Sequence, residues 1–272
     1  MGYIFDFQHK HLPHFFSEAE RARRDADFGL MLDKAKVVVV NARDVIDDIE
    51  RFHPNRQAKV VALPFSPAPT RDAFVLDVHE ARRKHEVVGP YFIICNQFWK
   101  HKDHATAFRA FAAIAKRYPD LSLVCTGATS DYRFPSHFQQ LMEQAARDGV
   151  AERIRVLGLI PKPEQLALLR GAVALIQPTL FEGGPGGGSV YDAVALGQHS
   201  IVSDIRVNRE ISEDTVTFFP VGEPEALSSC MEQALDAWPR RTTDQSELVR
   251  LGQFRRRQCG IALLQAIYEA RT

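Results

Sequence analysis

The amino-acid sequence predicts an α/β protein in which a partial parallel sheet precedes a complete, doubly wound parallel sheet. Short apolar runs of strand length alternate along the chain with segments whose apolar residues recur at helical spacing. Such alternation is typical of parallel strands joined by right-handed helical crossovers. A proline-rich stretch at 64–69, typical of a semi-rigid linker, interrupts the alternation once. We therefore expect a first unit over residues 1–70, a linker over 71–88 and a second unit over 89–272.

The first unit is expected to contain three strands separated by two helices. The strands are Tyr3–Phe7, Val37–Val40 and Lys59–Leu63. Ser17 and Glu20 have the spacing of a capping box, which predicts a helix from this point to about Lys34. Asn41 follows the second strand and is expected to cap a helix that runs through Arg51. Together these elements form a βαβαβ pattern.

The second unit repeats the alternation over a longer stretch and predicts a sheet of at least five strands. Its apolar runs are Tyr91–Cys95, Leu121–Thr126, Ile154–Leu157, Ala172–Pro178, Ser200–Ser203 and Val216–Phe219. Helical spacing lies between them, and Pro163 and Pro224 stand where helices are expected to begin. The chain after Asp244 is also expected to be helical. A sheet of this kind is doubly wound, with helices on both faces.

The composition is that of a globular protein with balanced charge. Hydrophobic residues make up 45% of the 272 residues and charged residues 25%. Lys+Arg and Asp+Glu both number 34, which argues against non-specific nucleic-acid binding. The four cysteines are widely spaced, with no pair at metal-ligand spacing, which favours thiols in a reducing compartment. No signal-peptide pattern is present, and no apolar run approaches the roughly 18 residues of a membrane span. We expect a cytoplasmic protein.

A glycine-rich turn between a strand and a helix is the stretch that most strongly indicates ligand binding. Five glycines lie within 183–188, so few side chains block the approach of a ligand to the backbone. Ser189 is expected to cap the helix that follows. Backbone N–H groups at a helix N-terminus suit phosphate, and the flanking carboxylates of Glu182 and Asp192 can accept hydrogen bonds from sugar hydroxyls. The turn predicts a nucleotide-sugar site; a loop that is merely glycine-rich is the alternative.

The loop 96–104 leaves the carboxyl end of the second unit's first strand and is expected to border the same crevice. Lys100 or Lys102 could neutralise phosphate there, although lysines on a polar loop are commonly only solvated. The sequence has neither a Walker-type glycine–lysine–serine pattern nor a dinucleotide fingerprint of three spaced glycines. Ser189 and Cys125 have no identifiable base, so covalent catalysis is not supported.

Three histidines follow the first expected strand, at positions 9, 11 and 14. A metal site is not supported, because no acidic or cysteine residue stands at ligand spacing beside them. His9 comes at the carboxyl end of the strand, where open α/β sheets bind ligands. It is therefore a candidate ligand contact, and a loop histidine bonded to backbone is the alternative.

The segment from Phe181 to Glu210 contains an ordered set of motifs. They are Glu-Gly before the glycine turn, an acidic residue and alanine after it, Leu196-Gly197, Ile201–Ile205 and Asn208–Glu210. This segment resembles the donor-binding segment of the group 1 (family 4) glycosyltransferases, which are retaining enzymes of the GT-B fold. Further matches are His101-Lys102, Val156–Pro161 and Leu166–Ala172. The resemblance covers nearly the whole chain and implies a GT-B-like pair of Rossmann-like lobes, the N-terminal one partial, with the nucleotide sugar between them.

The resemblance implies a role for each matching residue. Lys102 corresponds to the lysine that binds the diphosphate, and Glu182 to the glutamate that faces the transferred sugar. Asp192 lies where a second glutamate would hold the ribose hydroxyls, and His9 resembles the histidine that contacts the donor sugar and helps position it. The residues expected to border the base or to line the phosphate are Gly158, Leu159, Gln97, Gly183, Gly184, Gly187, Gly188 and Ser189.

The sequence departs from the family pattern in three ways. The spacing from Glu182 to Asp192 is two residues longer than usual, and aspartate is a methylene shorter than glutamate. Gln97 occupies the region where the family usually has an arginine, and losing that charge weakens transition-state stabilisation unless Lys100 substitutes. The family's first lobe normally begins well upstream with a glycine-rich loop, whereas this chain starts in the middle of that lobe.

We therefore expect transfer of a sugar from a nucleotide donor to a hydroxyl acceptor, a glycan or glycolipid, with retention of configuration and without a metal or cofactor. The alternatives are a non-catalytic nucleotide-sugar-binding module that needs a partner chain, and a dinucleotide oxidoreductase. Nucleic acid is not expected as a partner. Peripheral membrane contact is possible, and an unpaired strand edge in the first unit predicts self-association.

Overall fold

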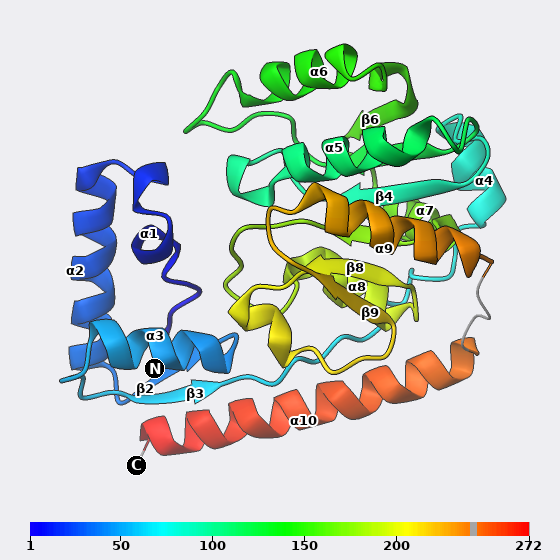
Figure 1. Ribbon diagram of the computed structural model, residues 1–272. Helices are drawn as coiled ribbons and strands as arrows, with labels where there is room; N and C mark the ends of the chain where they lie inside the picture. The colour runs from blue at the N-terminus through cyan, green and yellow to red at the C-terminus, as the bar shows by residue number, and fades with distance from the viewer. Residues whose placement is uncertain (240–243, 272) are drawn as a thin grey trace.

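The computed structural model, which describes residues 1–239 and 244–271, has two lobes that each contain one sheet (Figure 1). The first sheet has the strand order β1-β2-β3 and the second the order β6-β5-β4-β7-β8-β9. Every strand pair in this part of the chain is parallel. The predicted α/β class, with a small sheet followed by a complete one, is therefore confirmed.

The first lobe is built around strand β2 (Val37–Val40), whose four valines are all buried between two layers of helix. Its neighbours are β1 (Gly2–Tyr3) and β3 (Lys59–Ala62). The lobe's helices are α1 (Gln8–His11), the 3-10 turn η1 (Pro13–Phe15), α2 (Glu18–Lys34) and α3 (Arg43–Phe52). Because side chains alternate across a strand, Val38 and Val40 pack with α2 and α3, and Val37 and Val39 face the opposite way.

The first strand is shorter than the predicted Tyr3–Phe7. The chain leaves the sheet after Tyr3 and turns at Asp6, whose carboxylate accepts a hydrogen bond from the backbone N–H of Gln8 at 2.9 Å. This interaction places Gln8 at the start of the short helix α1, which the sequence pattern does not predict. The apolar residues Ile4 and Phe7 remain buried in the lobe's core, so the apolar residues of this segment report burial rather than strand pairing.

One predicted helix cap is confirmed and another is wrong. Ser17 and Glu20 form the expected reciprocal capping box at the start of α2. Asn41 does not cap α3, because its side-chain amide donates to the hydroxyl of Tyr3 at 2.7 Å. The first N–H groups of α3 are satisfied instead by Glu210, a residue of the other lobe.

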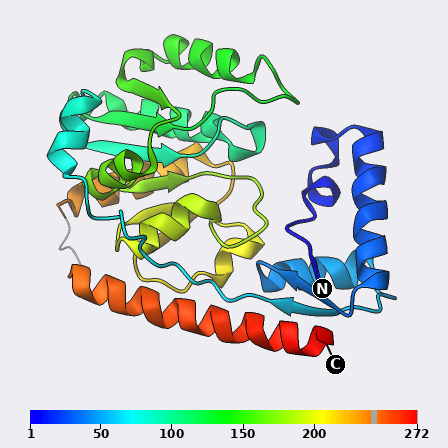
Figure 2. The ribbon, with the colours of Figure 1, turned by 180° about the vertical axis from the view of Figure 1, so that it is seen from behind.

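The second lobe is a six-stranded sheet with helices on both faces (Figure 2). Its strands are β4 (Tyr91–Cys95), β5 (Ser122–Thr126), β6 (Ile154–Gly158), β7 (Leu175–Gln177), β8 (Ser200–Ser203) and β9 (Val216–Phe219). Its helices are α5 (His104–Ala115), α6 (His137–Arg147), α7 (Lys162–Gly171), α8 (Gly187–Ala195) and α9 (Pro224–Asp236), with 3-10 turns η2 (Lys100–Lys102), η3 (Ala151–Arg153) and η4 (Arg206–Glu210). The strand order reverses between β4 and β7, and sheets of this kind bind ligands outside the carboxyl ends of such strands.

The segment expected to be a linker is folded onto the second lobe. It contains helix α4 (Val78–Lys84), which Asp77 caps by accepting a hydrogen bond from the N–H of Glu80. Ala73, Ala81 and Val87 are buried in the same cluster as helix α7. These apolar residues are too small and too widely spaced among charges to form a visible periodic pattern.

The last helix, α10 (Gln245–Arg271), returns from the second lobe to the first (Figures 1 and 2). Its Ala266 is buried against Val37 and Val39 of β2, and Lys59 forms an ion pair with Glu269 at 2.7 Å. Although the sequence assigns this helix to the second unit, its end completes the core of the first lobe. Among the described residues, no helix has the length and apolar character that crossing a membrane requires.

The turn η4 joins the two lobes beside the glycine-rich turn. Val207 is buried in the core of the first lobe, and the carboxylate of Glu210 accepts hydrogen bonds from the N–H groups of Arg43 and Asp44 at 3.1 and 2.8 Å. Arg206 forms ion pairs with Asp44 and Asp47 of α3. The lobes are therefore held together at the level of the glycine-rich turn.

Candidate functional site

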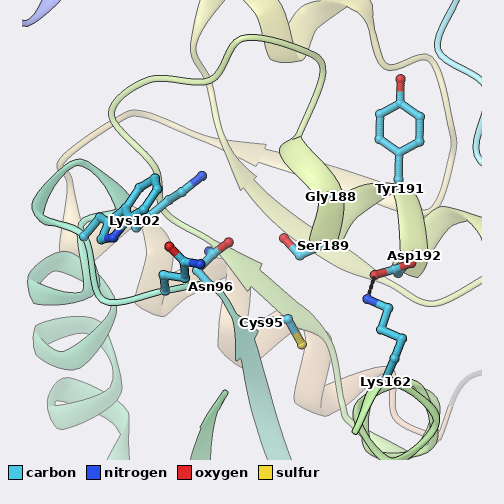
Figure 3. A pocket seen from close by; sticks show the side chains of 10 residues that line it. Cys95, Asn96, Lys102, Lys162, Gly188, Ser189, Tyr191 and Asp192 are labelled. Atoms are coloured by element: carbon cyan, nitrogen blue, oxygen red, sulfur yellow. Dashed lines mark hydrogen bonds and ion pairs between the residues drawn. The ribbon is translucent and has the colours of Figure 1, made fainter. Parts of the chain in front are cut away.

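Two adjoining pockets open where the carboxyl ends of β4 and β7 meet the first lobe. The larger has a volume of about 630 Å³ and is lined by Cys95, Asn96, Gln97, Trp99, Lys102, Lys162, Gly188, Ser189, Tyr191 and Asp192 (Figure 3). The smaller, of about 450 Å³, is lined by Phe5, Asp6, Asn41, Glu182, Gly183, Gly184, Gly187, Gly188 and Tyr191. Gly188 and Tyr191 belong to both. The glycine-rich turn is thus the wall that the two pockets share.

An ion pair between Lys102 and Glu182 lies at the boundary of the two pockets. The ammonium of Lys102 is 2.5 Å from Oε1 of Glu182, and both side chains are largely buried. Lys102 lines the larger pocket and Glu182 the smaller one. The structure therefore brings together the residues that the sequence predicts to hold a diphosphate and a sugar, although they are eighty positions apart.

The side chain of Gln177 holds the carboxylate of Glu182 in place by a hydrogen bond. It is completely buried at the end of β7, and its amide N–H donates to Oε1 of Glu182 and to the carbonyl of Gly186, each at 3.0 Å. Its amide oxygen accepts from Asn96 at 2.5 Å and from the hydroxyl of Ser189 at 3.0 Å. The side chains around the pocket boundary are therefore held in one connected polar network.

The glycine-rich turn needs glycine at positions where the chain is crowded or left-handed. Gly187 has φ of 63°, and a Cβ there would lie 2.9 Å from Oε2 of Glu182. A Cβ on Gly183 would lie 2.3 Å from the carbonyl oxygen of Phe5 in the first lobe. The two lobes approach each other at backbone distance here, and the turn has no room for a side chain at Gly183 or Gly187.

The helix after the turn begins earlier than predicted. Gly186 is the N-cap of α8 and provides no side-chain cap, so the predicted cap at Ser189 is wrong. Ser189 is the third residue of the helix, and its hydroxyl donates to Gln177 instead. The first N–H groups of α8 have no partner within the helix, and Gly188 and Ser189 of this first turn line the larger pocket. A helix N-terminus of this kind attracts a phosphate group.

Asp192 lies on the opposite side of the larger pocket from Lys102 and forms an ion pair with Lys162 (Figure 3). Asp192 is on α8, and Lys162 is the first residue of α7. The pocket therefore has one lysine–carboxylate pair at each end.

Gln97, which occupies the position where the family pattern has an arginine, lines the larger pocket. Lys100 does not replace that charge here. Its ammonium lies 4.4 Å from the ring centroid of Phe134 and 5.8 Å from that of Phe15, and Lys100 is not part of the pocket lining. Trp99, which lies between Gln97 and Lys100 in the sequence, does line the pocket.

Three predicted site residues lie outside both pocket linings. His9 is buried on α1, where its ring stacks on Phe7 and Nε2 lies 2.8 Å from the carboxylate of Asp25. Burial lowers the pKa of His9. Gly158 ends β6 with φ of 65°, and Leu159 beside it is 78% exposed. The three histidines do not converge, since His11 pairs with Asp48 and His9 with Asp25.

Burial lowers the pKa of His101, the residue before Lys102, to about 3, and the positive charges of Lys102 and Arg133 add to the effect. Its backbone carbonyl accepts hydrogen bonds from the N–H of Leu180 and the hydroxyl of Thr179. His101 is therefore a neutral structural residue that ties the loop after β4 to the segment before the glycine-rich turn. No group of three or more His, Cys, Asp or Glu side chains suited to a metal ion occurs in residues 1–239 and 244–271.

Sequence reasoning missed three polar residues that shape the site. They are Gln177, Lys162 and Asn208, the last of which accepts a hydrogen bond from the N–H of Gly186 at 2.7 Å. Gln177 and Asn208 are polar residues that end up completely buried, and a polar residue at the end of an apolar run is the signal that marks Gln177. Lys162 is the first residue of α7, and no local sequence pattern distinguishes it.

The fold is similar to that of several solved structures. Anabaena HepE, crystallised with UDP and glucose, has 14% identity and a TM-score of 0.68 over 99% of this chain and 68% of its own. Sucrose-phosphate synthase from Thermosynechococcus elongatus has 18% identity and a TM-score of 0.71 over 99% of this chain and 66% of its own. WaaG, a glycosyltransferase of lipopolysaccharide biosynthesis, has 16% identity and a TM-score of 0.66 over 95% and 70%. The chain thus spans about two thirds of the length of these proteins, and the likeness shows the GT-B fold with a partial N-terminal lobe.

No curated protein sequence matches the chain significantly. The sequence model of the family "Glycosyl transferases group 1" matches residues 77–247, which is more than half of the chain and includes both lysine–carboxylate pairs and the glycine-rich turn. The chain therefore belongs to the group 1 glycosyltransferases.

Proposed function

We propose that this chain, as a family 4 enzyme, transfers a sugar from a nucleotide-sugar donor to a hydroxyl acceptor with retention of configuration. The observation that carries the proposal is the ion pair of Lys102 and Glu182 at the boundary between two pockets. A cation beside a helix N-terminus suits a diphosphate, and a carboxylate in the neighbouring pocket suits sugar hydroxyls. The bond to be broken in a nucleotide sugar joins these two parts.

The nucleoside diphosphate would occupy the larger pocket. Lys102 and the N–H groups of Gly188 and Ser189 would bind the phosphates and stabilise the charge that develops as the sugar leaves. Asp192 would accept hydrogen bonds from the ribose hydroxyls at the other end of the pocket. UDP is the first nucleotide to test, because the structurally similar HepE was crystallised with UDP and with UDP-glucose.

The transferred sugar would occupy the smaller pocket beside Glu182, with Asp6 and Asn41 on the first-lobe side. When the phosphate pairs with the ammonium of Lys102, Oε1 of Glu182 loses that donor and can accept a hydrogen bond from a sugar hydroxyl. The departing phosphate oxygen would deprotonate the acceptor, which requires neither a metal nor a cofactor. His9 would act as a supporting residue of the first lobe, because its side chain is buried against Phe7.

A nucleotide-sugar-binding module without catalysis is the second candidate. The observation that favours it is the missing cation at Gln97, which Lys100 does not replace while it lies over Phe134. Both candidates bind donor, and only the first turns it over.

The deciding experiment is a turnover assay with UDP-sugars and with glycan or glycolipid acceptors. The wild-type chain should release UDP and form product, and Glu182→Gln should cut the rate by at least about tenfold with a nearly unchanged midpoint of unfolding. Glu143→Gln, an exposed change on α6, is the matched control and should leave turnover intact. Donor binding without turnover would favour the binding module, and a large loss of stability with transfer intact would make Glu182 structural.

A cytoplasmic location and a membrane-bound acceptor fit the same proposal. The four cysteines are unpaired, as expected in a reducing compartment. The outward face of α10 carries exposed Phe254 and Leu264 together with exposed Arg257, and we assign any peripheral membrane contact to this surface.

A further inference from the structure

Lys162 is held in place by two acceptors at the nucleoside end of the larger pocket. Its ammonium contacts Oδ2 of Asp192 (Figure 3) and also donates to Oε1 of Gln165 at 2.9 Å. The amide of Gln165 in turn donates to the hydroxyl of Thr126 at 2.7 Å, at the carboxyl end of β5. The ion pair is therefore anchored to the sheet rather than left as a loose surface contact.

We propose that Lys162 is a positioning residue that neutralises and orients the carboxylate of Asp192, so that this acid can lie in a pocket for a diphosphate. The inference rests on the proposed donor site. An unpaired carboxylate on the wall of the larger pocket would repel the phosphates that Lys102 attracts, whereas the pair with Lys162 cancels its charge. The pair also fixes where the short aspartate side chain presents its oxygens to the ribose.

A contribution to folding does not explain this ion pair. The side chain of Lys162 is 52% exposed and that of Asp192 is 22% exposed, and such pairs add little to the stability of a protein. A similar pair, formed by Lys84 of α4 and Glu164 of α7 at 2.6 Å with a 60% exposed lysine, lies outside both pockets. Lys84 is therefore a matched control for the loss of an exposed lysine–carboxylate pair.

The test measures the affinity for UDP, GDP and ADP by titration calorimetry at low salt. For the nucleotide that binds, Lys162→Met should weaken binding about fivefold, and the same change in an Asp192→Asn background should cost less than about twofold. Lys162→Arg should bind within about twofold of wild type, because it keeps the charge. Lys84→Met should bind as wild type does.

A second readout separates positioning from a general loss of charge. Removing the ribose hydroxyls, by using the 2′,3′-dideoxy form of the nucleotide, should weaken binding to wild type more than binding to Lys162→Met. This result is expected because a displaced carboxylate no longer reaches the ribose.

Two results would overturn the inference and a third would overturn its basis. An equal cost of Lys162→Met in the wild-type and Asp192→Asn backgrounds would show that Lys162 acts on the ligand itself. An unchanged affinity in Lys162→Met would show that the pair has no role in binding. Failure of the wild-type chain to bind any of the three nucleotides would instead contradict the proposed function, and the inference would fall with it.

Discussion

At the scale of single residues, each of the two lysines that line the larger pocket forms an ion pair with a carboxylate, so that the net charge of each pair is zero. Lys102 pairs with Glu182 and Lys162 with Asp192, so a bound phosphate would compete with a carboxylate for each lysine. The buried histidines nearby add no cation, because burial lowers the pKa of both His101 and His104 to about 3. The affinity for phosphate therefore depends on the lysines and on the N–H groups of α8.

We expect Lys102→Ala to weaken UDP binding, because the phosphate loses a charge-assisted hydrogen bond. Rising salt should narrow the difference in UDP affinity between wild type and Lys102→Ala, since dissolved ions screen the attraction between the ammonium and the phosphates. Calorimetric titrations at two salt concentrations measure both effects. Lys100→Ala is the control and should change little, because that ammonium lies over Phe134. Equal UDP affinity in wild type and Lys102→Ala would remove Lys102 from the site.

Acid should destabilise the protein partly through His104. The ring is completely buried, stacks on Phe98 at 4.1 Å, and has no hydrogen-bond partner for either nitrogen. Its pKa falls from the ordinary 6.5 to about 3 in the folded chain, so the unfolded chain binds more protons between these values. The free energy of unfolding therefore falls as the pH drops below about 6.5, by at most about 1.4 kcal/mol per pH unit for this group.

His104→Leu should flatten this dependence, because leucine cannot take up a proton. The midpoint of thermal unfolding at about pH 7 and about pH 5 gives the comparison. His14→Leu, at an exposed position, is the control and should keep the wild-type slope. An unchanged slope in His104→Leu would show that other groups cause the acid sensitivity.

At the scale of elements, the turn η4 connects the glycine-rich turn to the first lobe. Asn208 is completely buried, accepts from the N–H of Gly186 and donates to the carbonyl of Ser203 at 2.8 Å. Two residues later, Glu210 caps helix α3 of the first lobe. One short segment thus fixes both the shared pocket wall and the position of the lobe opposite it.

We expect Glu210→Ala to lower the free energy of unfolding by about 1 kcal/mol, as the loss of a helix N-cap does. Thermal or urea unfolding provides the measurement. Arg209→Ala, which removes a neighbouring exposed ion pair with Asp204, should stay within about 0.5 kcal/mol of wild type. If both changes cost the same, the contact of Glu210 with α3 does not matter to stability.

At the scale of the whole molecule, the first lobe has an open edge. Strand β1 lies at the edge of its sheet and contains two residues. Its Tyr3 is exposed, as are Met1 and Phe5 on either side of the strand. The far side of the sheet is covered by α10, so the edge rather than the face is open to a second chain. The edge of a sheet presents unpaired N–H and C=O groups, to which a strand of another molecule can add.

We therefore expect the chain to self-associate through β1, and Tyr3→Lys to reduce the association, because an edge lysine opposes strand pairing. Light scattering at matched concentrations measures the mass of each protein. Leu264→Lys, on the exposed face of α10, is the control and should leave the association unchanged. A monomeric wild-type chain would contradict the prediction, and a response only to Leu264→Lys would place the contact on α10.

Local sequence signals determined most of the architecture. The four valines of β2, the capping box of Ser17 and Glu20, and the alternation across 91–219 are patterns within short windows, and the structure confirms them. The glycine-rich turn could be recognised for the same reason, since its spacing is local. Parallel order then brings the loop after β4 to the same edge, which is why Lys102 and Glu182 could be expected to meet.

Only the tertiary structure decided which partner each polar group takes. The local sequence predicts Asn41 and Ser189 as helix caps. In the structure Glu210 accepts from the first N–H groups of α3, and the hydroxyl of Ser189 donates to Gln177. The pairing of Lys162 with Asp192 and the return of α10 to the first lobe likewise join residues far apart in the sequence. The physical reason is that burial makes an unsatisfied polar group costly, so the nearest partner in space is used wherever it lies along the chain.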